Sequence, residues 1–306
     1  MPLNELERLR GRLAITAVAL GVGTVFAILF SVGLTTSRAN DPFGMMDMNM
    51  GAFFGPFIIV VIIVFAAVLI YNSMYKDYRA KYKEVICRTV LEQMFDVEEF
   101  SPDKGFSEDF VENTFLVQRG NRFSSDDYVR GKYNGYSFER SDILVQEEVS
   151  DGENGSTTYT YFHGNWTIFE FPKSFSKYLM MKERELFFTS GPSGGLFSGK
   201  PKTHKVKFES IEFNEIFAVF AEDEHEAFYL LSPVFMERFM ELKKRTEGKM
   251  TVGFIDNKLH ILFDTGTNQM EPRLFTPVSE EDMRSIEVQM SIIGEIVDLF
   301  RLNENR

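Results

Sequence analysis

The chain has 306 residues, enough for one or two domains with a real core, and its formal net charge is −12. Residues 1–88 hold 9 Lys and Arg against 6 Asp and Glu, which leaves 24 basic and 39 acidic residues for the remainder. A remainder with a net charge of −15 repels nucleic-acid phosphates and anionic lipid headgroups. The charge balance therefore excludes nucleic acid as a partner.

Two apolar runs without any charged residue lie near the start of the chain, at Leu13–Leu34 and Met48–Met74. Each is as long as the roughly 20 apolar residues that a transmembrane helix needs. A cleaved signal peptide does not explain the first run, because the run is too long and a second one follows at once. The sequence predicts that residues 1–75 form two transmembrane helices joined by a short outer loop.

Basic residues flank these two runs mainly on one side of the predicted membrane. Arg8, Arg10 and Arg12 precede the first run, whereas the loop between the runs carries only Arg38. Five more basic residues follow the second run: Lys76, Arg79, Lys81, Lys83 and Arg88. This distribution predicts a multi-pass plasma-membrane protein with both termini and the large domain in the cytoplasm. The five residues after the second run are predicted to form a basic collar at the inner membrane surface.

Small residues recur in the first apolar run at Ala19, Gly23 and Ala27. A spacing of four places them on one helix face, where the backbone of another helix can approach closely. The sequence therefore predicts that this face packs the first helix against the second. Neither run contains a charge that would mark an ion or proton path, which argues against a transport role.

The outer loop contains Met45, Met46 and Met48 around Asp47. Methionine thioethers are soft ligands suited to Cu(I), so these residues are a candidate metal site. The alternative, which we favour, is that the flexible apolar side chains line the outer membrane boundary beside the phenylalanines of the same loop.

Good helix formers continue beyond the second run, and residues 76–100 are predicted to form a helical stalk that ends before Ser101-Pro102. Residues 101–188 then show short segments rich in aromatic and β-branched residues, separated by turn signals such as Asn134-Gly135. This pattern predicts an antiparallel β meander.

Residues 189–205 are predicted to form a flexible linker. Within it, GGLFSGKP resembles a phosphate-binding loop, but Pro201 stands where that motif needs a Ser or Thr hydroxyl to hold magnesium. The departure from the motif argues against nucleotide hydrolysis.

A cluster of carboxylates and one histidine falls within AEDEHEAF, residues 221–228, where Asp223 and His225 are candidate metal ligands. The structural alternative is that the cluster marks the point where a strand ends and a helix begins, since the helix dipole favours acidic residues in a first turn. His204 lies in the linker and His260 in a strand-like run, so neither offers His225 an evident partner. We favour the structural interpretation.

Residues 206–306 are predicted to form a second α+β part, with a hairpin about Asp256-Asn257 and an amphipathic helix that begins at Ser279. The apolar stripe of this helix either covers the sheet or docks a partner helix.

Several segments together resemble an uncharacterised prokaryotic family of two-helix membrane proteins with a cytoplasmic domain, whose members are often encoded beside LemA-type membrane proteins. The resemblance implies this architecture and points to a LemA-type partner, and it implies no catalytic residues. The segments are SSDDYVRGKYNGYSFERSDILVQEE, YFHGNWTIFEF, FAVFAEDEHEAFYLLSPVFMERFMEL, GFIDNKLHILF and MEPRLF.

These observations predict an α+β protein in which a transmembrane helical hairpin precedes a domain of antiparallel sheet and packed helices. Because no catalytic or cofactor-binding motif is complete, we expect no enzyme activity and no cofactor. The predicted function is a membrane-anchored protein that presents an acidic cytoplasmic domain for protein interaction. The alternative is a membrane-tethered enzyme or small-ligand sensor whose site is assembled across strands.

Overall fold

The structure is a computed structural model that describes residues 3–39, 50–150, 152, 155–170, 175–184, 191–192 and 199–304. The chain divides into two compact units. The helical unit consists of residues 1–86 together with the segment 271–282, and the sheet unit consists of residues 87–270 and 283–306.

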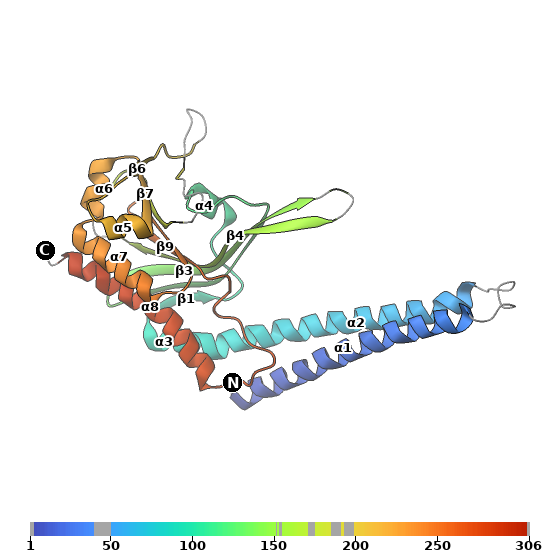
Figure 1. Ribbon diagram of the computed structural model, residues 1–306. Coiled ribbons are helices and arrows are strands. Elements are labelled where there is room, and N and C mark those ends of the chain that lie inside the picture. Colours follow the sequence, from blue (N-terminus) through green and yellow to red (C-terminus); the bar gives the residue numbers. More distant parts are fainter. Residues whose placement is uncertain are drawn as a thin grey trace. The chain divides into compact units, whose positions relative to one another are not determined.

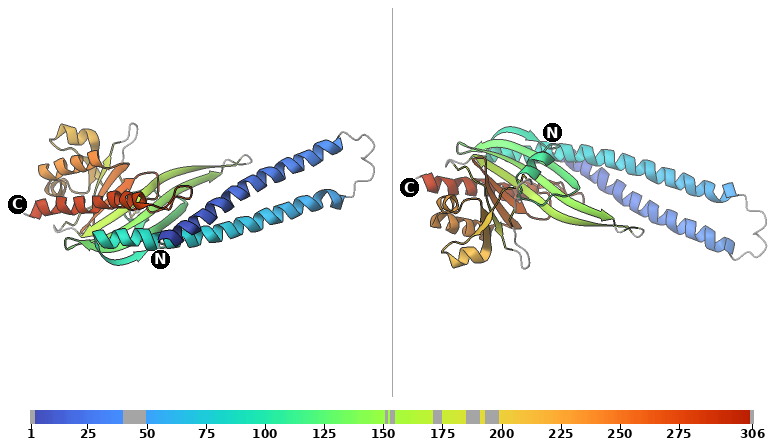
Figure 2. Two further views of the ribbon diagram at one scale, coloured as in Figure 1. Left: turned by 90° about the horizontal axis from the view of Figure 1, so that it is seen from below. Right: turned by 90° about the horizontal axis from the view of Figure 1, so that it is seen from above.

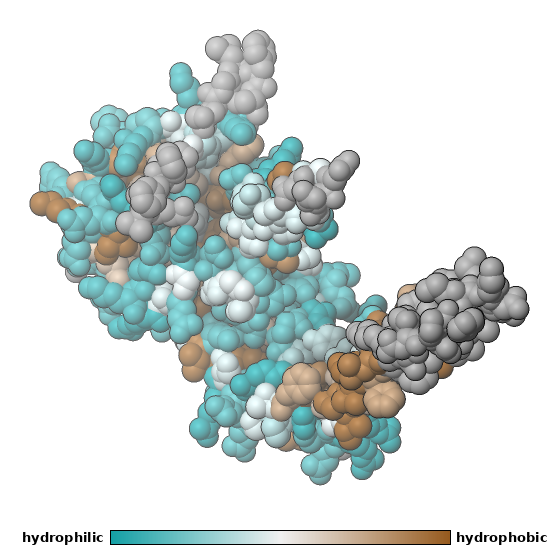
Figure 3. Space-filling view, turned by 45° about the vertical axis from the view of Figure 1, so that its right-hand side comes forward, coloured by the Kyte–Doolittle hydropathy of each residue, from teal (hydrophilic) through white to brown (hydrophobic). Residues whose placement is uncertain are grey.

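The helical unit contains two long helices, α1 (Leu3–Ala39) and α2 (Met50–Tyr82), which run side by side (Figures 1 and 2). Two helical stretches are long and apolar enough to cross a membrane: Leu3–Ala27 in α1, and Val61–Met94, which begins in α2 and continues past its end. Their apolar side chains point outward, and Figure 3 shows them gathered on the helices, whereas the sheet unit is mostly hydrophilic. The two predicted apolar helices are thus confirmed.

Among the described residues, the sheet unit contains nine strands that pair only in antiparallel fashion, in the order β1-β2-β3-β4-β9-β8-β5-β7-β6. With its packed helices, it confirms the predicted α+β class. The strands are β1 (Asp96–Ser101), β2 (Arg122–Tyr133), β3 (Tyr136–Ser150), β4 (Ser156–Glu170), β5 (Leu179–Glu183), β6 (His204–Val206), β7 (Phe217–Ala221), β8 (Lys249–Ile255) and β9 (Lys258–Asp264).

Helices cover both faces of the sheet. On one face, Val111 of α4 packs into an apolar cluster with Trp166 and Leu262 of the sheet. On the other face, Phe235 of α7 lies 6.2 Å from Phe254 of β8, measured between ring centroids. The helices are α3 (Arg88–Met94), α4 (Glu108–Asn113), α5 (Ile211–Ile216), α6 (Glu224–Leu230), α7 (Pro233–Arg245) and α8 (Glu280–Glu304), and a π-helical turn (Lys83–Cys87) precedes α3.

Two tight turns follow the sequence signals closely. Asn134 and Gly135 join β2 to β3, and Asp256 and Asn257 join β8 to β9; all four residues have positive φ, between 50° and 88°. Asn, Asp and Gly tolerate this left-handed region, which a two-residue hairpin turn requires. Both hairpin turns could therefore be predicted from the residues at the turn positions.

The two segments that were predicted as separate parts, 101–188 and 206–306, both contribute strands to one sheet. β4 pairs with β9, and β5 pairs with both β7 and β8. Close approach of β9 to β4 relies on Gly164, where a Cβ would collide with the carbonyl of Phe263. Part of the predicted linker 189–205 lies outside the described residues, and its end enters strand β6.

The predicted stalk is shorter than residues 76–100. Helix α3 ends at Met94, and Asp96–Ser101 forms the edge strand β1 paired with β2. The apolar helical run after residue 224 is also divided, because Ser232 caps a new helix whose first residue is Pro233. The stripe on α8 packs within the fold, since Ile286, Met290 and Ile293 are buried.

Candidate protein-interaction surface

A β-hairpin extends beyond the rest of the sheet. β2 pairs with β3 only as far as Gln146, and β9 pairs with β4 only from Gly164 onward. β3 and β4 nevertheless continue to pair with each other as far as Ser150 and Ser156. We call residues 147–150 and 156–162 the arm, which projects in green in Figure 1. The arm is a two-stranded ribbon with no third strand beside it among the described residues.

The two edges of the arm differ. On the β3 side, the Asn121 side chain accepts a hydrogen bond from the N–H of Glu148 at 2.8 Å and donates one to its carbonyl at 2.9 Å. On the β4 side, the backbone N–H of Gly266 donates to the carbonyl of His163 at 2.8 Å. Beyond that bond, no described strand pairs with residues 156–162. The β4 edge is therefore open where the β3 edge is closed.

The open edge has the composition of a strand that pairs readily. Thr157 to Phe162 reads TTYTYF, six aromatic and β-branched residues without a charge, which are the residue types most enriched in strands. Lysine and proline, which usually protect an edge strand from pairing, are absent from this run. The run does contain one irregularity, a β-bulge at Tyr161. Val145 pairs with Phe162 and Gln146 pairs with Thr160, so Tyr161 is the extra residue between them.

One face of the arm continues the apolar core that α4 covers. Ile143 and Val145 belong to that core, and alternation along the strand places Val149 on the same face. Tyr159 lies on this face too, because it pairs with Glu147. Val149 is 42% exposed and Tyr159 is 54% exposed. The apolar face thus extends past its helical cover and leaves two large side chains accessible.

The arm is also acidic. The sequence from Ser141 to Pro172 contains no Lys or Arg. Glu148 forms an ion pair with Arg122, whereas Glu147 has no ion-pair partner among the described residues. An extended segment that carries basic residues would therefore be attracted to this surface, and an acidic one would be repelled.

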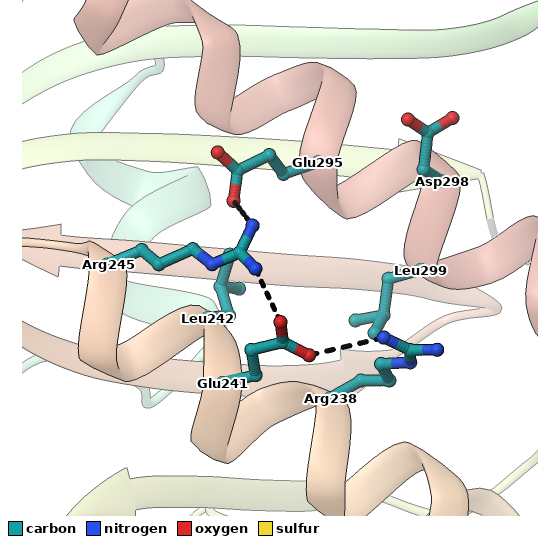
Figure 4. A pocket seen from close by; sticks show the side chains of 7 residues that line it. All are labelled: Arg238, Glu241, Leu242, Arg245, Glu295, Asp298 and Leu299. Atoms are coloured by element: carbon teal, nitrogen blue, oxygen red, sulfur yellow. Dashed lines mark hydrogen bonds and ion pairs between the residues drawn. The ribbon is translucent and has the colours of Figure 1, made fainter.

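The hollow between α7 and α8 does not offer a comparable site. It has a volume of about 200 Å³, and its charged residues pair with one another (Figure 4). Arg245 binds Glu241 and lies 3.8 Å from Glu295, while Arg238 lies 3.1 Å from Glu241. Leucines supply its apolar lining, which is small for the largely apolar pockets that bind small molecules.

His260 has a structural role in the sheet. It lies on β9 with 2% of its surface exposed, and its Nδ1 accepts a hydrogen bond from Trp166 Nε1 at 3.2 Å. Burial, with a smaller effect of the positive charge on Lys258, lowers the pKa of His260 to about 3. The imidazole is therefore neutral near pH 7 and holds the only tryptophan of the chain in place.

The acidic cluster that suggested a metal site has structural contacts instead. Asp223 caps α6 by accepting a hydrogen bond from the N–H of Glu226 at 2.8 Å. The Glu226 carboxylate accepts hydrogen bonds from the N–H groups of Ser176 and Lys177, both at 2.8 Å. These contacts confirm the helix-start interpretation of Asp223, and His225 is exposed on α6. The other candidate ligands, Met45, Met46 and Met48, lie outside the described residues.

The basic residues after the second apolar helix do not form a free collar. The Lys83 side chain has no exposed surface, and its ammonium group lies 2.8 Å from a carboxylate oxygen of Glu271, which also binds Arg79. Lys83 is therefore not available to a lipid headgroup, and the prediction is wrong for it. Membrane-surface binding stays a prediction for the others, of which Lys76 is exposed: Lys76, Arg79, Lys81 and Arg88.

The small-residue face of α1 is largely exposed among the described residues. Ala19 and Gly23 are exposed, Ala27 is partly buried, and a Cβ added to Gly23 would meet no described atom within 4 Å outside its own helix. Packing of the first helix against the second through this face stays a prediction.

Sequence reasoning missed the arm as a surface. The signal was present, because an uncharged TTYTYF run follows a turn and lies within 32 residues that lack any basic side chain. The sequence did not show that strands β2 and β9 both end before they reach the arm.

The fold and surface together define an α+β domain that follows two candidate membrane helices and carries an open strand edge on the arm. Residues 160–302 match a family described as "Protein of unknown function (DUF3137)". Comparison with curated proteins gives no match. Neither this family nor the structure described below carries the name of an enzyme, and a non-catalytic role stays a prediction.

One solved structure is similar, the "crystal structure of the mycobacterial trehalose monomycolate transport factor A, TtfA". The likeness covers 71% of this chain and 97% of that chain, with 8% sequence identity and a TM-score of 0.32. Likeness at this level does not establish a common fold.

Proposed function

We propose that this protein is a membrane-anchored interaction module, and that its partner adds an extended segment to the open β4 edge of the arm. The observation that carries the proposal is the edge from Thr158 to Phe162, which pairs with no strand other than β3 among the described residues, beside a β3 edge that Asn121 closes. Pairing by strand addition is a common way for an exposed sheet edge to bind a peptide.

The backbone chemistry of the arm favours a third strand. Each residue carries one N–H and one C=O that require hydrogen bonds, and half of those along an edge point away from the sheet. An isolated two-stranded ribbon is marginally stable in water, whereas three strands with an apolar face are stable. A partner segment would thus complete the arm and order it.

The side chains of the arm define the chemistry of the partner. Val149 and Tyr159 form an apolar surface that alternate side chains of an added strand would cover. Glu147 and the absence of Lys and Arg from the surrounding sequence favour basic residues in the same segment. The partner segment is therefore extended, and on the side that faces the arm it carries both apolar residues, which cover Val149 and Tyr159, and a basic residue, which pairs with Glu147.

The membrane topology supports an intracellular partner. α1 and α2 are the anchors, and the basic residues that flank them favour a plasma-membrane protein with both termini and the sheet unit in the cytoplasm. Ion pairing of Arg79 and Lys83 does not weaken this argument, because acidic residues contribute little to the rule. The family resemblance makes a LemA-type membrane protein the first partner to test.

Photocrosslinking of the full-length protein in its native membranes tests the proposal. A photoreactive phenylalanine replaces Tyr159 on the arm or, as a matched control, Tyr229 on α6, which is 56% exposed. We expect a discrete crosslinked product from position 159 that is absent from position 229.

Proline substitutions at the open edge provide the second part of the experiment. Of two adjacent residues in β4, one has its N–H directed away from β3, so Thr157→Pro and Thr158→Pro are made separately. The variant that keeps the native circular dichroism spectrum has lost only an outward donor. The crosslink at position 159 should disappear in that variant. Equal crosslinking at 159 and 229, or an unchanged product in the proline variant, would contradict strand addition.

A further inference from the structure

A short segment of the helical unit holds an aromatic side chain out into solvent at a defined level along the two apolar helices. This segment, residues 271–282, contains part of the MEPRLF motif and is called the strap. Phe275 of the strap is 73% exposed, and Leu274 beside it is partly exposed. Single exposed apolar residues are common on proteins, so exposure alone does not indicate a binding surface. The position of Phe275 along the axes of α1 and α2 is the informative observation.

Hydrogen bonds fix the strap to both helices of the unit. Arg10 of α1 donates from Nη1 to the carbonyl of Leu274 at 2.8 Å, and the N–H of Val278 donates to the carboxylate of Glu7 at 3.0 Å. On α2, Arg79 donates from Nε to the carboxylate of Glu271 at 2.8 Å. The strap is therefore attached on each side of Phe275.

Prolines restrict the strap further. Pro272 is buried before Phe275, and Pro277 follows two residues after it. The proline ring fixes φ and reduces the freedom of the intervening residues. Phe275 is thus exposed because the prolines and the hydrogen bonds of the strap fix the backbone on each side of it.

The contacts with α1 locate Phe275 relative to the apolar run. Arg10, which binds the residue before Phe275, precedes Leu13 by three positions, roughly 4.5 Å along the helix axis. Leu13 begins the run without charge that ends at Leu34. If α1 crosses a bilayer with this run, the strap lies where hydrocarbon gives way to headgroups.

Aromatic residues on α2 mark the same zone. Tyr71 and Tyr75 stack with their ring centroids 6.4 Å apart, shortly before Tyr78 and the strap contacts. Aromatic side chains gather at membrane–water interfaces because the ring is apolar and the surroundings are partly wet. Phe275 would add to this belt from a different part of the chain.

The geometry points to a third membrane contact: the strap inserts Phe275 and the edge of Leu274 into the interfacial layer of the bilayer that α1 and α2 cross. This inference rests on the membrane anchoring in the proposed function. The occupant of the exposed surface is lipid, because Arg10 holds the strap within about one helical turn of the apolar run of α1. Covering by a second protein is the competing outcome of the test.

Spin-label depth measurements on the full-length protein test the inference. A nitroxide is attached to a single cysteine in a Cys87→Ala background, and the protein is reconstituted into vesicles of phosphatidylcholine and phosphatidylglycerol. Three positions are compared: Phe275→Cys in the strap, Val25→Cys within the apolar run of α1, and Ile211→Cys on α5. All three are exposed in the structure, at 73%, 57% and 76%, so that local burial does not separate them.

Collision with oxygen, which concentrates in lipid, is compared with collision with a water-soluble nickel chelate. We expect oxygen to dominate at position 25, the chelate to dominate at position 211, and position 275 to lie between them on the lipid side. If position 275 behaves like position 211 while position 25 is in lipid, the inference is wrong and the anchoring stands. If position 25 is also in water, the membrane anchoring itself is wrong. Shielding of position 275 from both reagents would indicate a protein contact and overturn the lipid assignment.

Discussion

Arg140 and Asp142 form a buried ion pair within the sheet unit, and Asp142→Asn tests what this pair contributes to stability. Both residues lie on β3, their side chains are 1% and 0% exposed, and Arg140 Nη2 lies 2.8 Å from Asp142 Oδ1. Arg140 also donates to Gln269 Oε1 at 2.8 Å, while Asp142 Oδ2 accepts from the Gln269 N–H at 2.9 Å. Asparagine keeps an oxygen for the Gln269 N–H, but it removes the negative charge and places an NH2 group in the position of Oδ1, beside the guanidinium.

The expected loss of stability depends on which hydrogen-bond and charge partners the Arg140 guanidinium keeps after the substitution. At 2.8 Å and an effective dielectric constant of about 20, two unit charges attract by about 6 kcal/mol, from which desolvation must be subtracted. After the substitution, the guanidinium would keep one neutral acceptor, Gln269, and its Nη1 already has no hydrogen-bond partner among the described residues. Removing one partner of a buried pair typically costs about 3–5 kcal/mol. We therefore expect Asp142→Asn to destabilise the sheet unit by that amount.

Urea unfolding of the full-length protein in detergent, followed by the fluorescence of Trp166, measures the loss. Trp166 is the only tryptophan and is fully buried, so its emission reports the sheet unit. The double variant Arg140→Met, Asp142→Asn removes both charges and should recover most of the stability. A cost below about 1 kcal/mol for Asp142→Asn, or a double variant no more stable than the single one, would refute the reasoning that an uncompensated buried cation causes the loss.

Three further predictions concern a cap, a titration and the topology. Asp223→Ala should lower the free energy of unfolding by about 1 kcal/mol in the same assay, because it removes the cap of α6, whereas the exposed neighbour His225→Ala should change it little. The lowered pKa of His260 means that, between about pH 3 and the ordinary value of 6.5, the unfolded chain binds a proton at this residue more readily than the folded chain. The free energy of unfolding should therefore decrease as the pH is lowered from 6.5 to about 3. The slope from this group is at most about 1.4 kcal/mol per pH unit, it should vanish above that window, and His260→Gln should lack it. Protease added to intact spheroplasts should leave the sheet unit whole, and its digestion there would refute the cytoplasmic assignment.

Features set by neighbouring residues could be predicted from the sequence. The apolar runs, the hairpin turns at Asn134-Gly135 and Asp256-Asn257, and the Asp223 cap each depend on the chemistry of a few adjacent positions. Strand β1 was missed for the converse reason. Asp96–Ser101 follows a helix directly and carries three acidic residues, and its pairing with β2 is fixed by contacts more than 20 residues away in sequence.

The arm shows why a surface is harder to predict than an element. Its composition was visible, but an edge becomes a surface only where its neighbours end, and β9 leaves β4 at Gly164 because the chain turns there with Gly266 bonded to His163. The opposite edge has the same two-stranded geometry, yet Asn121, 27 residues from Glu148, closes it with two side-chain hydrogen bonds. Asn121→Ala should therefore open the β3 edge as well without changing the β4 edge. If strand addition depends on an open edge alone, that variant should gain a second crosslinking surface at Val149. If it depends on the uncharged TTYTYF run, as we propose, Asn121→Ala should leave the crosslinking pattern unchanged.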